Sequence, residues 1–340
     1  MILERQITEV EKIKITDIFG RTFKTLRVSL TNTCNLACTY CIDPAASNNK
    51  TPLPDSALPM GLANKKTALS NEQYIKIIAA LNDILEFDTI RLTGGEPLLY
   101  KQLVPLVKGI KELGISEIKM TSNATLLAGK AKDLQSAGLT SINISLDAID
   151  PDVSFSINQR AKLQKILDGI DKSIEAGIQV KINCVVMKGM NDHQILSLIN
   201  YSKERNIIIR FLELMQMGHL YHNFEQLFFS EEEILKTISN HYQLIALPRN
   251  PSATANYWTI NTDYKFGIIS NVSDPFCNDC NRLRLDSYGN IYGCLSDNNP
   301  INISDCIDDE LQVKERLIQA LAQKKTKFSG SELSMLHIGG

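Results

Sequence analysis

The sequence lacks the features that mark a membrane, secreted or nucleic-acid-binding protein. No stretch approaches the roughly 18 consecutive apolar residues of a transmembrane helix, and the segment MILERQITEVEK is charged where a signal peptide would be apolar. An excess of one charge is also missing, because 36 Lys and Arg residues oppose 38 Asp and Glu residues and create no overall field for a nucleic-acid backbone. These absences predict a cytoplasmic protein with no membrane and no nucleic-acid partner, in which any anion site is local.

Low-complexity tracts and short-period repeats are absent as well. Of the 340 residues, 44% are hydrophobic, which is ample for a packed core and excludes disorder as the main state. The length suits two ordinary domains or one large α/β domain.

Six of the eight cysteines fall into two groups. In a cytosolic chain, grouped thiols favour metal or cluster ligation over a disulfide framework. The first group reads CNLACTYC, and the second reads CNDC followed by another cysteine after thirteen intervening residues. The groups consist of Cys34, Cys38 and Cys41, and of Cys277, Cys280 and Cys294.

Segments rich in β-formers alternate with helical patterns over most of the chain. Six βα-type units in a row predict a parallel sheet with helical crossovers, either a doubly wound sheet or a partial barrel. Both architectures place ligands at the carboxyl ends of the strands. Strands are expected at 26–31, 89–94, 117–122, 141–147, 179–187 and 207–214, and helices at 71–87, 101–114, 126–138, 164–177 and 192–206.

Two regions depart from this pattern. Proline, glycine and small polar residues predict a long functional or disordered loop over 42–70. After about residue 218 the repeat ends and a smaller appended α+β domain is expected, so the predicted domains are 1–218 and 219–340. Its strands are predicted at 257–260, 265–270, 282–286 and 290–293, and its helices near 229–240 and 309–324.

The first cysteine group directly follows the first predicted strand. Three thiolates on one loop can hold three irons of a [4Fe-4S] cluster and leave the fourth iron open, although a zinc knuckle with a distant ligand or three unrelated thiols are alternatives. After the second strand comes RLTGGEP (91–97), whose paired glycines allow close backbone approach but which alone is more often a plain turn.

Together, these two motifs resemble the radical S-adenosylmethionine (SAM) superfamily. The resemblance implies a partial (βα)6 TIM-like barrel over residues 20–215, with a cluster on Cys34, Cys38 and Cys41 that chelates SAM. It also implies that SAM contacts Tyr40, Gly95, Ser145 and Met215. Without the resemblance, a serine in a strand such as Ser145 indicates no particular role, and a methionine at a strand end such as Met215 is more often a packing residue.

The second cysteine group allows two interpretations. Its three thiols suit another cluster with an open iron, or Cys306 closes a structural zinc site of four thiolates. Arg282 and Arg284 follow Cys280 at strand spacing and share one face. On residue types alone, this pattern fits an anion site and two exposed arginines on a solvated strand equally well.

The segment from Phe266 to Leu295 matches FGxIxxxSxxFCxxCxRxRLxxxGxxxxCL and resembles the C-terminal motif of the GTP 3',8-cyclases of molybdenum cofactor biosynthesis. That resemblance implies a radical SAM lyase with two [4Fe-4S] clusters, and a C-terminal Gly339-Gly340 pair inserted into the active site rather than a frayed end. Lys181 shares strand parity with Asn183, which favours an inward-facing cation over an exposed lysine. The implied GTP contacts are Arg21, Arg91, Thr121, Lys181, Arg282 and Arg284.

The resemblance further implies a reaction in which a 5'-deoxyadenosyl radical takes hydrogen from C3' of GTP. The ribose radical then attacks C8 of guanine and yields (8S)-3',8-cyclo-7,8-dihydroguanosine 5'-triphosphate after another electron and proton. No side chain is assigned a catalytic acid or base role, because the cofactor carries the chemistry. The implied partners are an electron donor, a downstream cyclic pyranopterin monophosphate synthase and a second copy of the chain in a homodimer.

Three positions depart from the family pattern. Asn123-Ala124 replaces the usual Asn-Gly, Tyr100-Lys101 replaces paired basic residues, and the loop at 43–66 diverges in composition. The alternatives are a radical SAM peptide-modifying enzyme with a C-terminal cluster domain and a non-catalytic iron-sulfur or zinc scaffold, and SAM cleavage would exclude the scaffold.

Overall fold

The computed structural model of the chain describes residues 15–43 and 68–339. Most of the predicted loop at 42–70 and the terminal Gly340 lie outside the described residues.

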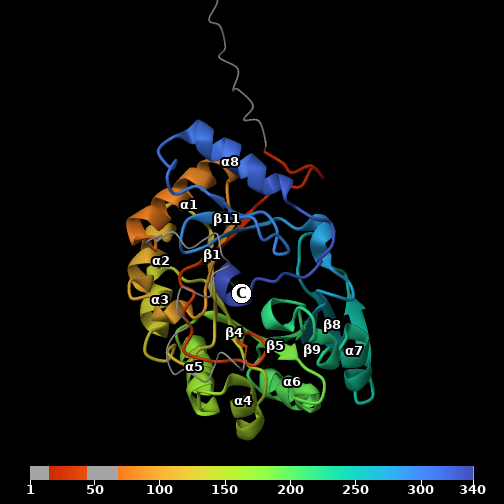
Figure 1. The fold of residues 1–340 in the computed structure, drawn as a ribbon. Helices are drawn as coiled ribbons and strands as arrows, with labels where there is room; N and C mark the ends of the chain where they lie inside the picture. Colours follow the sequence, from red (N-terminus) through yellow and green to blue (C-terminus); the bar gives the residue numbers. More distant parts are fainter. Residues whose placement is uncertain (1–14, 44–67, 340) are drawn as a thin grey trace, which may run out of the picture.

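A curved parallel sheet with outer helices forms the first two thirds of the chain (Figure 1). All six predicted strands are confirmed and lie side by side in sequence order, each parallel to the next. The strands are β1 (Thr25–Ser29), β2 (Thr89–Thr93), β3 (Glu117–Ser122), β4 (Ser141–Ser145), β5 (Gln179–Val186) and β6 (Ile208–Glu213). The predicted crossover helices are α1 (Asn71–Leu85), α2 (Leu103–Glu112), α3 (Ala131–Ala137), α5 (Leu163–Glu175) and α6 (Ile195–Glu204).

An additional helix, α4 (Pro151–Asn158), follows β4. Asp150 caps it by accepting hydrogen bonds from the backbone N–H groups of Asp152 and Val153, and Pro151 occupies the first turn. Short 3-10 turns occur at η2 (Pro97–Leu99), η3 (Asp192–Gln194), η4 (Gly218–Leu220), η5 (Phe224–Gln226) and η6 (Phe276–Asp279).

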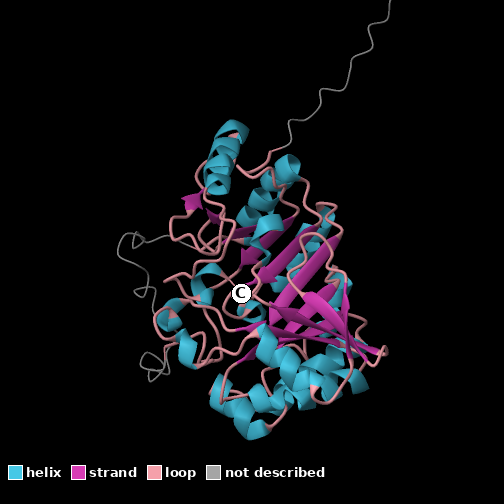
Figure 2. Ribbon diagram, turned by 90° about the vertical axis from the view of Figure 1, so that its right-hand side faces the viewer, coloured by secondary structure: helices cyan, strands magenta, loops and turns pink. Residues whose placement is uncertain are grey.

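The C-terminal region extends both edges of the sheet. Strand β10 (Arg282–Leu285) pairs in parallel with β1, and β9 (Tyr264–Ile269) pairs in parallel with β6. The result is a continuous twelve-stranded sheet among the described residues (Figure 2), in which the region after residue 219 adds strands at both edges. A partial barrel leaves two open strand edges, and pairing covers both. The remaining elements are β7 (Leu244–Leu247), β8 (Asn256–Ile260), β11 (Asn290–Tyr292), β12 (Ile301–Asn302), α7 (Glu231–Ser239), α8 (Glu310–Ala322) and α9 (Met335–Ile338).

Alternation along the strands separates an apolar outer face from a polar inner face. In β1, Leu26 and Val28 are fully buried against the helices, whereas Arg27 between them lines the inner cavity. Helix α1 supplies the matching outer layer, because Tyr74, Ile77, Ile78, Leu81 and Leu85 recur at helical spacing and are buried. The main core therefore lies between sheet and helices, and the inner face is free to carry polar chemistry.

The described helices include none with the length and apolar character needed to cross a membrane.

Candidate functional site

A cavity of about 580 Å³ lies on the inner face of the sheet, a size typical of small-molecule sites. All six grouped cysteines line it. The register explains how they reach the same cavity, because Thr25 at the start of β1 pairs with Arg282 at the start of β10. Cys34 follows the carboxyl end of β1, while Cys280 precedes β10, so the two cysteine groups lie toward opposite ends of neighbouring parallel strands.

The first cysteine group has the donor chemistry of a three-thiolate cluster site. Cys34, Cys38 and Cys41 carry free thiols that line the cavity, and the backbone N–H of Leu36 donates to Cys34 Sγ at 3.4 Å. Burial raises the pKa of Cys34 to about 11 and that of Cys41 to about 12, so cluster binding would displace protons from them. In the described ranges, no three Cys, His, Asp or Glu side chains converge on a position where they could bind one metal ion. Thiolates that hold a cluster do not have to converge in this way, because each of them binds a different iron.

The GGEP segment packs directly on this cysteine loop. The backbone N–H of Gly95 donates to the Thr31 carbonyl at 2.6 Å, and the N–H of Glu96 donates to the Thr33 carbonyl at 2.9 Å. A Cβ on Gly94 would lie 2.6 Å from the Thr31 oxygen, so only glycine permits this approach. The glycines therefore hold the cysteine loop against β2 as well as lining the cavity.

Buried carboxylates support the same end of the cavity. Tyr40 Oη donates to Asp147 Oδ2 at 3.0 Å, and the Val185 backbone N–H donates to Asp147 Oδ1 at 2.9 Å. Burial raises the pKa of Asp147 to about 6 and that of Glu96 to about 7. Asp147 was not among the predicted residues, although its place directly after a strand could have indicated it. The predicted SAM contacts Tyr40, Gly95, Ser145 and Met215 all line the cavity.

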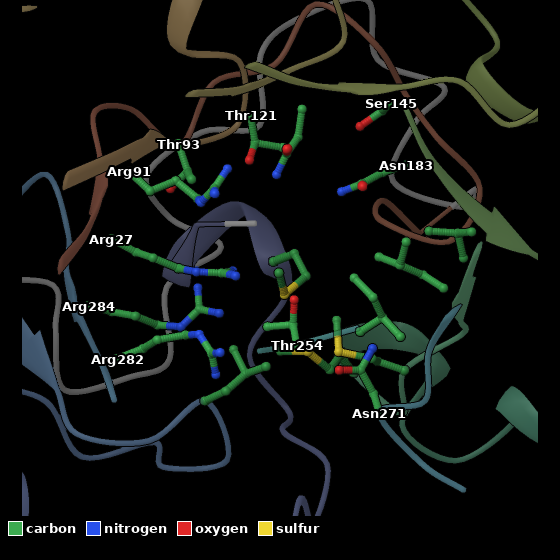
Figure 3. A pocket seen from close by; sticks show the side chains of 18 of the residues that line it. Arg27, Arg91, Thr93, Thr121, Ser145, Asn183, Thr254, Asn271, Arg282 and Arg284 are labelled. Carbon is green, nitrogen blue, oxygen red and sulfur yellow. The ribbon is translucent and has the colours of Figure 1, made fainter. Parts of the chain in front are cut away.

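Four arginines form one wall of the cavity, which we call the arginine wall: Arg27, Arg91, Arg282 and Arg284. Figure 3 shows their side chains reaching into the cavity from one side, across from Ser145, Asn183 and Asn271. Arg27 pairs in register with Arg284 of β10 and with Arg91 of β2, which places three cations at one level. Arg27 was missed from the sequence, although its alternation with Leu26 and Val28 could have indicated it.

The arginine wall is short of negative partners. Nε of Arg27 and Nη1 of Arg91 are buried without a hydrogen-bond partner among the described residues. Burial together with neighbouring cations lowers the pKa of Arg91 to about 9 and that of Arg284 to about 10. An unpaired buried charge costs several kcal/mol, so the wall is suited to a multiply charged anion.

The C-terminal segment reaches into this cavity. Arg284 Nη1 donates to the carbonyl of Gly339, whose φ of +82° favours glycine. A Cβ on Gly339 would lie 2.5 Å from Thr93 Oγ1 and 2.9 Å from Ser29 Cβ. Gly339 thus lies against Arg284 of the arginine wall, whereas Gly340 lies outside the described residues, and the insertion of the glycine pair into the active site stays a prediction.

Comparison with known proteins decides the family. Residues 28–201 match the radical SAM superfamily, and residues 207–330 match the family described as Molybdenum Cofactor Synthesis C. The GTP 3',8-cyclase of Helicobacter pylori is 35% identical over 328 residues, covering 92% of this chain and 94% of that protein. The GTP 3',8-cyclase of Staphylococcus carnosus is 35% identical over 351 residues, covering 96% and 99%. The chain belongs to the GTP 3',8-cyclase family.

Solved structures support the fold. Streptococcus suis SuiB bound to S-adenosylmethionine superposes with a TM-score of 0.62 at 15% identity, covering 88% of this chain and 68% of that one. Native anSMEcpe with bound AdoMet gives a TM-score of 0.53 at 16% identity, covering 84% and 79%. The predicted partial radical SAM barrel is confirmed, and the chain is a radical SAM enzyme of the cyclase family.

Within this GTP 3',8-cyclase family member, the predicted substrate residues are not all in the cavity. Thr121 lines the cavity, but Arg21 does not. Arg21 Nε pairs with Asp17 Oδ2 at 2.6 Å, and Arg21 Nη1 donates to the backbone carbonyls of Cys277 and Lys325. Arg21 therefore lies against the second cysteine loop, and its contact with GTP stays a prediction.

Lys181 is not among the residues that line the cavity. Burial and the nearby cations Arg210, Lys119 and Arg91 lower its pKa to about 8. Lys119, another residue missed from the sequence, lines the cavity and pairs in register with Arg91. Basic residues thus continue from the arginine wall onto β3 and β5.

The second cysteine group does not include Cys306. That thiol is buried in the main hydrophobic core, where Sγ donates to the Ile303 carbonyl at 3.5 Å. The four-thiolate zinc site considered above is therefore not formed, since its fourth ligand lies elsewhere. Cys280, in contrast, has cationic neighbours. Burial alone would raise the pKa of this thiol, but Lys324 and Arg282 lower it to about 7.

Proposed function

We propose that the chain converts GTP to (8S)-3',8-cyclo-7,8-dihydroguanosine 5'-triphosphate, the reaction for which its family is named and the first step of molybdenum cofactor biosynthesis. The observation that carries this proposal is the arginine wall between two three-thiol groups in one cavity. A multiply charged nucleotide matches the wall, and each thiol group matches a cluster with an open iron.

The residues at the carboxyl end of β1 fit the SAM site of the family. Cys34, Cys38 and Cys41 would hold the cluster, and Tyr40, Gly95, Ser145 and Met215 would surround SAM. When bound, the cluster and SAM would supply the radical chemistry that acts on C3' of GTP. The hydrogen bond from Tyr40 to Asp147 fixes the aromatic ring that faces the cavity.

The second group would hold a second cluster on Cys277, Cys280 and Cys294, which anchors the guanine end of the substrate. A cluster with an open iron is favoured over zinc because Cys306 lies in the core and supplies no fourth thiolate. We propose this second cluster as a substrate-binding group, separate from the cluster that would bind SAM.

The arginine wall would bind the triphosphate and ribose, with Lys119, Thr121 and Lys181 extending the same surface. Guanidinium groups form paired, charge-assisted hydrogen bonds to phosphate oxygens and fix orientation as well as affinity. The Gly339 segment narrows the cavity on this side, which helps exclude water from the reacting atoms. No side chain is required as an acid or a base, because these residues bind and orient.

The reaction also requires an electron donor, and a downstream cyclic pyranopterin monophosphate synthase would consume the product. A homodimer is part of the same proposal.

The test is an anaerobic incubation of reconstituted protein with SAM, a strong reductant and GTP, analysed by mass spectrometry. We expect 5'-deoxyadenosine and a cyclised isomer of GTP together, and no cyclised nucleotide when ATP replaces GTP. Deoxyadenosine without the isomer would contradict the substrate assignment, and absence of both from protein that carries both clusters would contradict the activity.

A further inference from the structure

Lys324 is a buried cation that the proposed reaction does not use. It follows α8 and lies against the second cysteine group, with only 6% of its surface exposed. Its ammonium group lies 4.8 Å from the centroid of the Phe23 ring, which forms an apolar side of its environment. The side chain is therefore removed from water, where an ammonium group is costly without compensation.

The hydrogen-bond partners of Lys324 are a sulfur and a carbonyl. Its Nζ donates to Cys280 Sγ at 3.5 Å and to the backbone carbonyl of Arg282. Arg282 Nη1 also donates to Cys280 Sγ, at 3.7 Å. One thiol thus receives two cationic donors from two different elements.

No carboxylate balances Lys324 within the described residues. The charged groups that act on it are the thiols of Cys280 and Cys294, which favour its charge, and the Arg21 guanidinium, which opposes it. A buried ammonium group beside another cation requires an anion. The anions within reach are the thiolates of the second cysteine group, which become fixed negative charges when they ligate a metal centre.

We propose that Lys324 is the counter-ion of the second cluster and raises its reduction potential through the hydrogen bond to Cys280. This inference rests on the proposed second cluster and extends it. Reduction adds negative charge to a cluster, and positive charge and hydrogen bonds at its sulfur ligands favour the reduced form. Lys324 also donates to the carbonyl of Arg282, so the same side chain contacts both the second cysteine group and the arginine wall.

The experiment isolates the second cluster in the full chain. In a background carrying Cys34→Ser, Cys38→Ser and Cys41→Ser, iron, sulfide and zinc are quantified after reconstitution, and the midpoint potential is measured by a titration followed by electron paramagnetic resonance. The variants are Lys324→Met, which removes the charge, and Lys324→Arg, which keeps it. The control is Lys327→Met, because Lys327 lies three residues away and is exposed.

We expect Lys324→Met to retain iron with a lower midpoint potential, or to lose iron, while Lys324→Arg and Lys327→Met match the parent. Thermal unfolding of the metal-free proteins separates cluster loss from misfolding. An unchanged midpoint potential and full iron content in Lys324→Met would overturn the counter-ion role. Zinc instead of iron in the parent would contradict the second cluster itself, which is a separate failure of the proposed function.

Discussion

The two cysteine groups contain the same number of thiols but lie in opposite electrostatic surroundings. Around the first group, burial raises the pKa values of Cys34 and Cys41, and the charged residues that act on its thiols are Glu96, Asp147 and the cation Arg160. Around the second group, Lys324 and Arg282 supply positive charge to Cys280. The number of thiols alone therefore does not assign a role to a cysteine group. The second group, with its cationic neighbours, adjoins the arginine wall, whereas the first group adjoins the predicted SAM contacts.

The largest expected effect separates the two groups by function. Cys34→Ser should abolish both 5'-deoxyadenosine and cyclised product, because the SAM cluster loses a ligand. Cys294→Ser should abolish cyclised product but leave SAM cleavage, because its loss affects the opposite end of the cavity. Both products are quantified by mass spectrometry under anaerobic conditions.

Cys306→Ser is the matched control, since that thiol lies in the core away from the cavity. It should retain both activities. Unchanged turnover in Cys294→Ser would break the division between the groups.

The next effect concerns the arginine that the sequence did not indicate. Arg27→Met should lower kcat/KM for GTP by roughly 10- to 150-fold, corresponding to about 1.5–3 kcal/mol for a lost hydrogen bond to a charged group. SAM binding should be retained, because Arg27 lies within β1 on the arginine wall, whereas Cys34 follows the carboxyl end of that strand. Steady-state kinetics and SAM affinity measured on the same preparation check both statements.

Lys203→Met provides the control, because Lys203 forms an exposed ion pair with Asp263 at 2.9 Å, away from the cavity. If Arg27→Met and Lys203→Met have the same kinetics, Arg27 does not bind the substrate.

A smaller effect should appear as pH dependence at Lys181. Burial and neighbouring cations lower its pKa to about 8 in the free protein, and a bound triphosphate favours the protonated form. GTP affinity should therefore be highest below that pKa and fall as pH rises through it, by at most about tenfold per pH unit for one linked proton. Calorimetric titrations from about pH 7 to about pH 9 measure the slope.

In Lys181→Met the affinity should be lower throughout and the decline near that pKa should vanish. Persistence of the same decline in the variant would assign it to another group.

The smallest effect is expected beside the first group, at the position where the family usually has glycine. Ala124 adopts a φ of +61° and is fully buried against Gly169. Ala124→Gly relieves left-handed strain but loses methyl packing and adds unfolded-state freedom, so the free energy of unfolding should change by less than about 1 kcal/mol. Chemical denaturation measures it, with Gly169→Ala as the contrast, because the added methyl group would lie 2.5 Å from the Ala124 carbonyl.

Local patterns predicted the elements well because alternation and helical periodicity are local properties. The same patterns missed α4, although Asp150 and Pro151 carry a helix-start signal. They also could not indicate that β9 and β10 complete the sheet edges, since strand pairing between distant segments leaves no local trace.

Site residues that belong to a short sequence motif could be predicted, whereas residues that meet only through folding of distant segments were missed. The cysteines lie in compact motifs, whereas Lys324 meets Cys280 from 44 positions away in the chain. The position of Arg21 outside the cavity lining could not be predicted, because nearness to β1 in sequence does not decide on which side of the strand a side chain lies. Its guanidinium group pairs with Asp17, four residues earlier.

In the proposed complex, GTP lies between the two cysteine groups with its ribose within reach of the SAM end. The most direct measurement is an anaerobic turnover with GTP deuterated at C3', followed by mass spectrometry of the 5'-deoxyadenosine formed. We expect deuterium in that 5'-deoxyadenosine together with the cyclised product. Unlabelled 5'-deoxyadenosine accompanying cyclised product would contradict it.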